Sequence, residues 1–277
     1  MVVLVALGVA YAAYAANQQN KGSQEEKEKE STPEIDPLLL PFWRELSHIR
    51  LLRHEREFTL FELPVVTVTW YQGDYRAIEN SLRLRVEAVM DANPWLSGWV
   101  LPNLDCDGEI EMFFDPTGQR RSPDHFVVCD DGPVVDHMKA TYSDYAALLD
   151  DSRVCVLSNT SLIGKDLPLF KVAIIPDGKQ PNDMFALVMS LSHQAADART
   201  YYNVFKMLDL TAKEPVIRVL DPHRRMGYYD KLQDSVGTDI FYMTNSIANG
   251  MRGEAASEKP QWQQLLEKNR DVDEDDP

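Results

Sequence analysis

Two short apolar runs in the second half of the chain constrain its fold more than any other feature. Leu169 to Ile175 and Met184 to Leu191 each have the length and composition of a strand buried in a sheet. The turn signal Pro176-Asp177-Gly178 closes the first run. The second run leads directly into Ser192 and His193, so we expect a buried strand that delivers a histidine at its carboxyl end.

Strand and helix patterns are mixed through the rest of the folded region. Strands are expected at 64–71, 95–101, 109–114 and 126–129. Helices are expected at 75–92, 142–149 and 239–249, and after His193, where Tyr201, Val204, Phe205 and Leu208 share one face. The order of these elements predicts an α/β (α+β) sandwich, in which helices pack on one face of a mixed β-sheet.

Composition excludes several classes of function. The chain has 277 residues and a formal net charge of −16. A surface this acidic repels phosphates, so we expect no nucleic acid among its partners. Cys106, Cys129 and Cys155 are widely spaced and form no CxxC pair. They predict neither a zinc site nor a disulfide framework, although one bridge with one free thiol stays open, and we expect no metal.

The chain divides into four parts by composition. Residues 1–16 are an apolar signal or anchor segment, and 17–36 are a charged linker. Residues 37–250 form the folded lobe, and 251–277 are an exposed acidic tail. This division predicts one folded region with solvated segments at both ends.

The apolar amino terminus bears on localisation. Val2 to Ala16 carries no charge but is shorter than the roughly 20 residues that span a bilayer. It fits a signal-peptide apolar region or a short anchor, with membrane contact through residues 2–16. The alternative is an apolar helix packed on the domain. We therefore expect a membrane-associated or secretory-pathway protein, with a cytoplasmic location as the alternative.

His193 and Asp197 are the candidate catalytic residues. They lie four apart, between the buried strand and the amphipathic helix. A neutral imidazole can remove a proton from an alcohol or amine near neutral pH. The carboxylate of Asp197 can pair with an arginine and fix the loop that orients the ring. A structural histidine is the alternative interpretation, because this spacing alone is common.

The context of the two residues resembles the chloramphenicol-acetyltransferase-like superfamily, whose HxxxD motif corresponds to His193 and Asp197. The superfamily includes plant BAHD acyltransferases, condensation domains of peptide synthetases, and alcohol and wax-ester acyltransferases. The helix at 75–92 followed by Asn93-Pro94-Trp95-Leu96-Ser97-Gly98 is similar to the family's first helix and strand entry. The resemblance covers about residues 57–210, which is one CoA-dependent acyltransferase-like lobe.

The resemblance implies an HxxxD-type acyltransferase. His193 would act as general base on the hydroxyl or amine of an acceptor, which attacks an acyl thioester carried on CoA or a carrier protein. Acyl-CoA would then be a co-substrate, and Asp197 would orient the site. No acyl-enzyme would form.

Three departures from the family pattern keep other interpretations open. Ala198 stands where the family usually has glycine, and Ser192 stands where condensation domains commonly carry a second histidine. The DFGWG-type motif of two-lobed members is absent. The chain is therefore also interpretable as a non-catalytic binding module, as a fragment of a two-lobed enzyme, or as a homo-oligomer that completes its site across an interface.

The other charged motifs have simpler interpretations. Arg44, Arg50, Arg53 and Arg56, with His48 and His54 among them, predict a basic helix face. Contact of these arginines with CoA phosphates or a membrane is the alternative, and Arg120-Arg121 and Arg224-Arg225 are weaker candidates of the same kind. His125 and His137 flank an acidic stretch that can bind a cation, but spacing alone does not predict it.

Overall fold

The computed structural model describes residues 3–5, 35–56, 63–106, 109–130, 135–209 and 216–237. The chain divides into two compact units. The first contains residues 1–10 and 29–224, and the second contains residues 11–28 and 225–277. In the second unit the structure describes residues 225–237, which contain helix α7 (Tyr228–Val236). All further elements belong to the first unit.

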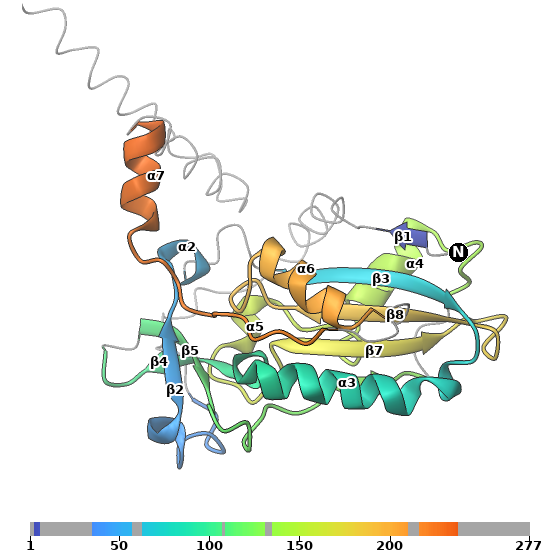
Figure 1. Ribbon diagram of the computed structural model, residues 1–277, viewed down its shortest axis with the longest axis horizontal. Coiled ribbons are helices and arrows are strands. Elements are labelled where there is room, and N and C mark those ends of the chain that lie inside the picture. Colours follow the sequence, from blue (N-terminus) through green and yellow to red (C-terminus); the bar gives the residue numbers. More distant parts are fainter. Residues whose placement is uncertain are drawn as a thin grey trace, which may run out of the picture. The chain divides into compact units, whose positions relative to one another are not determined.

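A five-stranded mixed sheet forms the centre of the first unit, in the order β1-β3-β8-β7-β6 (Figure 1). Its strands are β1 (Val3–Val5), β3 (Val65–Gln72), β6 (Phe126–Val128), β7 (Phe170–Pro176) and β8 (Met184–Leu191). Its neighbouring strands are antiparallel except β6 and β7, which are parallel. The predicted strands at 64–71, 126–129, 169–175 and 184–191 are confirmed to within one residue at each end.

A second, three-stranded antiparallel sheet has the order β2-β5-β4. Its strands are β2 (Ser47–Arg50), β4 (Trp99–Asn103) and β5 (Glu109–Phe114). Gly98 lies so close to β5 that a Cβ atom there would be 2.2 Å from the carbonyl oxygen of Phe113. Only glycine therefore permits this approach of the two backbones. The predicted pairing of 109–114 with the preceding strand is confirmed.

Helices cover both faces of the large sheet. They are α3 (Glu79–Ala92), α4 (Tyr142–Leu149) and α6 (Ala198–Met207), with the single turns α2 (Arg53–Arg56) and α5 (Asn159–Leu162). Leu82 of α3 and Tyr201 of α6 pack against Val172, Leu187 and the other side chains of one face. Figure 1 shows α3 and α6 beside β7 and β8. The predicted class of fold is confirmed.

The helix α4 adds a layer that the sequence did not predict. Its Tyr145 and Leu148 pack with Val68, Ala173 and Val188, which alternate with the residues that face α3 and α6. The Tyr145 hydroxyl also accepts a hydrogen bond from Nε1 of Trp70 at 3.1 Å. The large sheet therefore has helices on two faces, where the sequence predicted one covered face.

Two local predictions were wrong. Residues 95–101 were expected to be one strand, but Pro94–Ser97 form a 3-10 helix and β4 begins at Trp99. Proline fixes φ for a first helical position, and the Ser97 hydroxyl donates to the Pro94 carbonyl at 2.8 Å. The basic segment 44–56 is not one helix either, because it contains β2 and only the short turn α2.

Several predicted segments lie mainly outside the described residues. These are the apolar segment 1–16 except β1, nearly all of the linker 17–36, the helix at 239–249 and the tail 251–277. Among the described residues, no helix has the length and apolar character needed to cross a membrane. The division into four parts stays a prediction.

Candidate functional site

His193 lies in the loop that follows β8, and hydrogen bonds fix the backbone of this loop. Ser192 has no exposed surface, and its backbone N–H donates to the Leu169 carbonyl at 2.8 Å. Its hydroxyl donates to Oδ1 of Asn159 at 2.7 Å. The Ser192 carbonyl then accepts from the N–H groups of Ala195 at 3.0 Å and Ala196 at 3.2 Å, which closes the turn around His193. These hydrogen bonds therefore tie the backbone of the loop to β8 and to the segment before β7.

The His193 ring is half-buried at the end of the strand. Burial lowers the pKa of its imidazole, since the charged form loses hydration, and the nearby carboxylate of Asp197 opposes this by raising it. The net direction is downward. A pKa below the ordinary value of about 6.5 leaves the ring neutral at pH 7, which is the form that accepts a proton.

Asp197 caps the helix that follows the loop. It has extended backbone geometry, and its Oδ1 accepts a hydrogen bond from the Thr200 backbone N–H at 2.7 Å. Carboxylates are favoured at this position because they satisfy a free N–H at the positive end of the helix. Ala198 is the first residue of α6, so its backbone is helical. The helix therefore starts without need of a glycine.

Arg224 connects the His193 loop to a carboxylate far away in the sequence. Its Nη2 donates to the carbonyl oxygens of Gln194 and Ala195, the latter at 3.2 Å. Its Nε donates to both carboxylate oxygens of Glu55, at 3.2 and 3.1 Å. The two side chains are 9% and 11% exposed, so this ion pair is shielded from water. The carboxylate that pairs with the loop's arginine is thus Glu55.

Glu55 and Gln194 make further contacts that tighten the loop. The Glu55 carboxylate accepts from the Leu52 N–H at 2.7 Å, and the Glu55 carbonyl accepts from Nε2 of Gln194 at 3.3 Å. Gln194 has no exposed surface. The loop is therefore held by β8 on one side and by α2 on the other.

An extended strap, residues 216–224, brings Arg224 to the loop. The buried side chain of Asn93, at the end of α3, bonds the two successive peptide groups on either side of Val219 in this strap. Its Nδ2 donates to the Arg218 carbonyl at 2.9 Å, and its Oδ1 accepts from the Leu220 N–H at 2.7 Å. Asn93 thus fixes the path of the strap, and the strap ends where Arg224 bonds the loop.

Tyr201 anchors α6 onto the large sheet. Its hydroxyl donates to the Met189 carbonyl at 2.9 Å and lies 2.8 Å from the Thr67 hydroxyl. Burial raises the pKa of this phenol, so it stays a neutral donor. The neighbouring Tyr202 is exposed. The helix that Asp197 caps is therefore fixed to β3 and β8, the strand that ends at His193.

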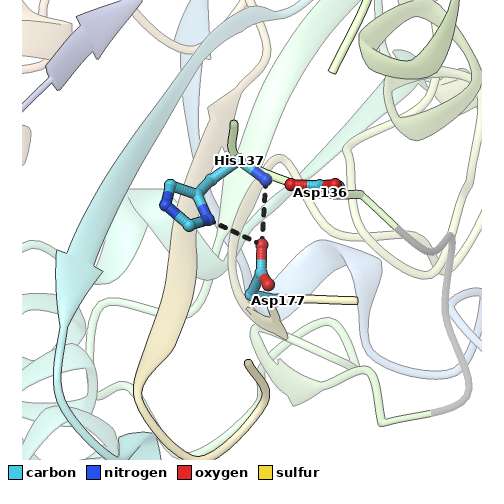
Figure 2. Close-up of side chains that lie close together, drawn as sticks. All are labelled: Asp136, His137 and Asp177. Carbon is cyan, nitrogen blue, oxygen red and sulfur yellow. Dashed lines mark hydrogen bonds and ion pairs between the residues drawn. The ribbon is translucent and has the colours of Figure 1, made fainter. Parts of the chain in front are cut away.

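Asp136, His137 and Asp177 come together at the end of β7, and their potential metal-binding atoms lie within 4.8 Å of one another (Figure 2). The Asp177 carboxylate is already hydrogen bonded to the backbone N–H and Nδ1 of His137, at 2.8 and 3.0 Å. The N–H groups of Lys179 and Gln180 donate to its other oxygen. The Lys179 ammonium is 2.7 Å from Asp136. These contacts indicate a turn closure, not a cation site.

The remaining candidates lie apart from this cluster or in ordinary ion pairs. His125 is buried and bonds the Phe170 carbonyl through Nδ1 at 2.7 Å. Arg50 and Arg56 both pair with Glu109, at 3.3 and 3.0 Å. Arg224 was expected to be a solvated or phosphate-binding residue, and the structure buries it against Glu55 instead. The arginine cluster is therefore not gathered into one basic surface.

The sequence did not indicate Glu55 as part of the site, and it did not predict that Asn93 and Arg224 would hold the His193 loop. Arg224 lies 169 residues from Glu55 and 30 from Gln194, so no local spacing connects them. Glu55 is one of two acids, with Glu45, in the basic segment 44–56, and Asn93 ends a predicted helix. Neither feature singles these residues out in the sequence.

The fold and the site define a mixed α/β lobe with a histidine on the loop after a central strand. No protein-family model matches the sequence, and no curated protein matches it. Similar structures are known, however. One is TRI101 of F. graminearum in complex with coenzyme A and T-2 mycotoxin, at 15% identity and a TM-score of 0.41, covering 58% of this chain and 38% of TRI101.

Two other similar structures come from peptide synthetases. The epimerization domain of the third module of tyrocidine synthetase B has 10% identity and a TM-score of 0.43, and the match covers 77% of this chain and 47% of that domain. The starter condensation domain of rhizomide synthetase has 11% identity, a TM-score of 0.42, and coverages of 76% and 49%. The chain spans less than half the length of each of these three structures.

Proposed function

We propose that this chain takes part in acyl transfer from an acyl thioester to a hydroxyl or amine acceptor, with His193 as general base. The observation that carries the proposal is the placement of one half-buried imidazole, with a lowered pKa, on a loop fixed by β8 and by the Arg224–Glu55 pair. A positioned base of this kind accelerates proton transfer by about 10²–10⁴-fold.

The reaction follows from the neutral state of the ring. A ring nitrogen of His193 takes the proton of the acceptor as its oxygen or nitrogen attacks the thioester carbonyl carbon. The carbon–sulfur bond then breaks, and the departing thiolate of CoA or a carrier protein takes the proton back from the imidazolium. The acyl group ends on the acceptor, and the histidine returns to its neutral form.

Asp197 and Arg224 act in this proposal as positioning residues. Asp197 caps α6 and thereby fixes one end of the loop, while Arg224 bonds the two carbonyl groups that directly follow His193. A ring that is held in place loses little entropy when it meets its substrate. Ala198 begins α6, so an alanine at this position is compatible with the role of Asp197 as the helix cap.

A non-catalytic binding module is the second candidate. The observation that favours it is the extent of the match, because the chain corresponds to only 38% of the length of TRI101. If the chain is catalytic instead, a second copy of the chain, a partner or a further lobe would have to supply the wall that faces His193. We include a homo-oligomer that completes the site among these options, and sedimentation velocity on the purified chain tests it.

Thiol release tests the main proposal. The purified chain is mixed with short- and long-chain acyl-CoA and a panel of alcohols and amines, and free CoA is measured together with acylated product by mass spectrometry. We expect turnover, and a loss of about 10²–10⁴-fold in His193→Ala. His223→Ala, which removes an exposed imidazole, is the matched control and keeps its activity.

Two results oppose the proposal in different ways. Full turnover by His193→Ala removes the histidine from the mechanism. CoA binding without turnover by the native chain, at any acceptor tested, favours the binding module.

We also propose membrane association or entry into the secretory pathway through residues 2–16, on the basis of their uncharged apolar sequence. Removal of residues 1–20 then shifts the protein from the membrane fraction to the soluble fraction. An unchanged distribution opposes this proposal and favours a cytoplasmic protein.

A further inference from the structure

A cavity of about 410 Å³ lies beside the edge of the large sheet, and His193 is not among its lining residues. This volume is within the range of small-molecule sites, roughly 300–1,000 Å³. Its walls are formed by β6, β7 and the segment between α4 and β7. Most of the lining is aliphatic, with Val127, Val156, Leu162 and Leu167 as examples.

Lys171 of β7 places an ammonium group in this lining. The residue is 5% exposed, and its neighbours Phe170 and Val172 point to the opposite face of the sheet. Its Nζ donates one hydrogen bond, to the Ser152 carbonyl at 2.7 Å. Within the described part of the chain, no carboxylate forms an ion pair with it. Burial lowers the pKa of this amine, while Asp124 and, to a smaller extent, Cys155, Cys129 and Asp151 raise it.

This arrangement leaves hydrogen-bonding capacity unused. An ammonium group has three donors, and the contacts of Nζ in the described residues occupy one. A buried charge without a partner is unfavourable by several kcal/mol, so buried lysines are normally paired. An anion in the cavity would supply the missing partner.

The other charged groups of the lining limit which anion fits. Arg153 is already paired with Asp151 at 2.8 Å. Asp124 is exposed at the cavity and lies near enough to act on Lys171 electrostatically. Its carboxylate repels a second negative charge, so the site favours a monoanion over a phosphate dianion.

We propose that this cavity binds a monocarboxylate with an aliphatic body, the carboxylate at Lys171 and the body along the walls formed by Val127, Val156, Leu162 and Leu167. Burial of the aliphatic body contributes about 25 cal/mol to the free energy of binding per Å² of apolar surface removed from water. The ion pair with Lys171 orients the ligand in the cavity. The proposal does not depend on any activity of His193.

Calorimetry with two matched probes tests the site. Decanoate and decan-1-ol have the same apolar chain and differ in the charge of the head group. We expect the full-length chain to bind one decanoate, below its micelle concentration, at least 10-fold more tightly than decan-1-ol. Lys171→Met is expected to remove this preference, while Lys165→Met, which removes an exposed lysine, keeps it.

Leu167→Trp provides a second test that leaves the lysine intact. Leu167 is half-buried in the lining, and the larger side chain fills part of the cavity, so both probes should bind at least 10-fold more weakly. If circular dichroism shows that Lys171→Met does not fold, the proposal is tested by Leu167→Trp and by the ratio of the two affinities on the native chain. Equal affinity for the two probes, no saturable binding, or unchanged binding in Leu167→Trp overturns the proposal.

Discussion

The guanidinium of Arg224 bonds two features that are far apart in the sequence, the carboxylate of Glu55 and the carbonyl groups after His193. Its Nε donor is shared between the two carboxylate oxygens while Nη2 bonds the carbonyl groups, and lysine, which presents a single point charge, cannot reproduce this division of donors. Since the pair is shielded from water, each partner depends on the other. At the scale of single residues, this pair holds the two backbone carbonyl groups that follow His193.

Arg224→Met is therefore expected to destabilise the protein by about 3–5 kcal/mol, because it leaves the Glu55 carboxylate buried without a partner. Urea denaturation measures this loss. Arg225→Met, at an exposed neighbouring position, is the control and should change stability by less than about 0.5 kcal/mol. The double variant Arg224→Met with Glu55→Met should recover part of the stability.

The same variants separate positioning from folding. In the stability-restored double variant we expect kcat for acyl transfer to stay reduced while KM changes little, because the loop carbonyls have lost their donor. Arg224→Lys should not rescue kcat. A double variant with native kcat would show that Arg224 serves the fold alone.

Asp177 gives a pH-dependent contribution to stability. Its hydrogen bonds to His137, Lys179 and Gln180 outweigh its desolvation and lower the pKa of its carboxyl group to about 2. The unfolded value is higher, so this stabilisation is complete above about pH 4 and disappears as the pH falls towards 2.

Asp177→Asn should destabilise the protein by about 1–3 kcal/mol at pH 7, because an amide nitrogen replaces an oxygen that accepts N–H bonds. The difference from the native chain should shrink as the pH falls from 4 to 2, as measured by urea denaturation at each pH. A difference that is constant over this range contradicts the account.

Local spacing predicted the strand–loop–helix unit that carries His193 and Asp197, and their role in a site stays a prediction. It could not predict Glu55 or Arg224, whose contacts depend on how the strap and α2 fold back onto the loop. The sequence also predicted a basic helix face over the segment 44–56. In the structure Arg50 and Arg56 instead form ion pairs with Glu109 of β5. Pairing between distant segments is where the sequence alone is weakest.

At the scale of elements, the large sheet and its helices could largely be predicted from two signals: short continuous apolar runs for the strands and helical spacing of apolar residues for the helices. The strands at 65–72 and 184–191 are continuous β-branched or apolar runs, and α3 repeats Leu82, Val86 and Val89 on one face. The region 95–101 failed because apolar composition alone does not distinguish a 3-10 turn from a strand. The signal there was Pro94, which favours the first position of a helix.

The start of α6 gives a prediction about Asp197. Asp197→Ala should destabilise the protein by about 0.5–2 kcal/mol, since the Thr200 N–H loses its acceptor. Asp197→Asn keeps an acceptor and should stay within about 0.5 kcal/mol of the native chain. Thermal denaturation of both variants measures the difference, and equal losses would show that the charge, not the cap, is what matters.

At the scale of the first unit, the two sheets share one core. Ile49, Val100 and Met112 of the small sheet pack in the same cluster as Leu187 and Met189 of the large one. A further cluster around Trp43, Trp99 and Phe113 covers the other side of the small sheet. Because side chains of both sheets pack directly against one another in the first of these clusters, we expect the two sheets to unfold together.

Met112→Ala should therefore destabilise both sheets, by about 2–5 kcal/mol. Met112 has no exposed surface. The signals from tryptophan fluorescence and circular dichroism should shift together in urea. Leu84→Ala, at a position on α3 that is 56% exposed, is the control and should have little effect. Two separate transitions in Met112→Ala would show that the sheets are independent.

The central claim is that a neutral His193 removes the acceptor's proton, and the pH dependence of kcat/KM for acyl transfer tests it most directly. A general base works only when it is deprotonated, so the rate must rise with pH through its pKa. Burial lowers that pKa. We predict an acid limb with a midpoint below about 6.5. A rate that shows no acid limb over the pH range in which the protein stays folded, or a midpoint above about 6.5, contradicts the account.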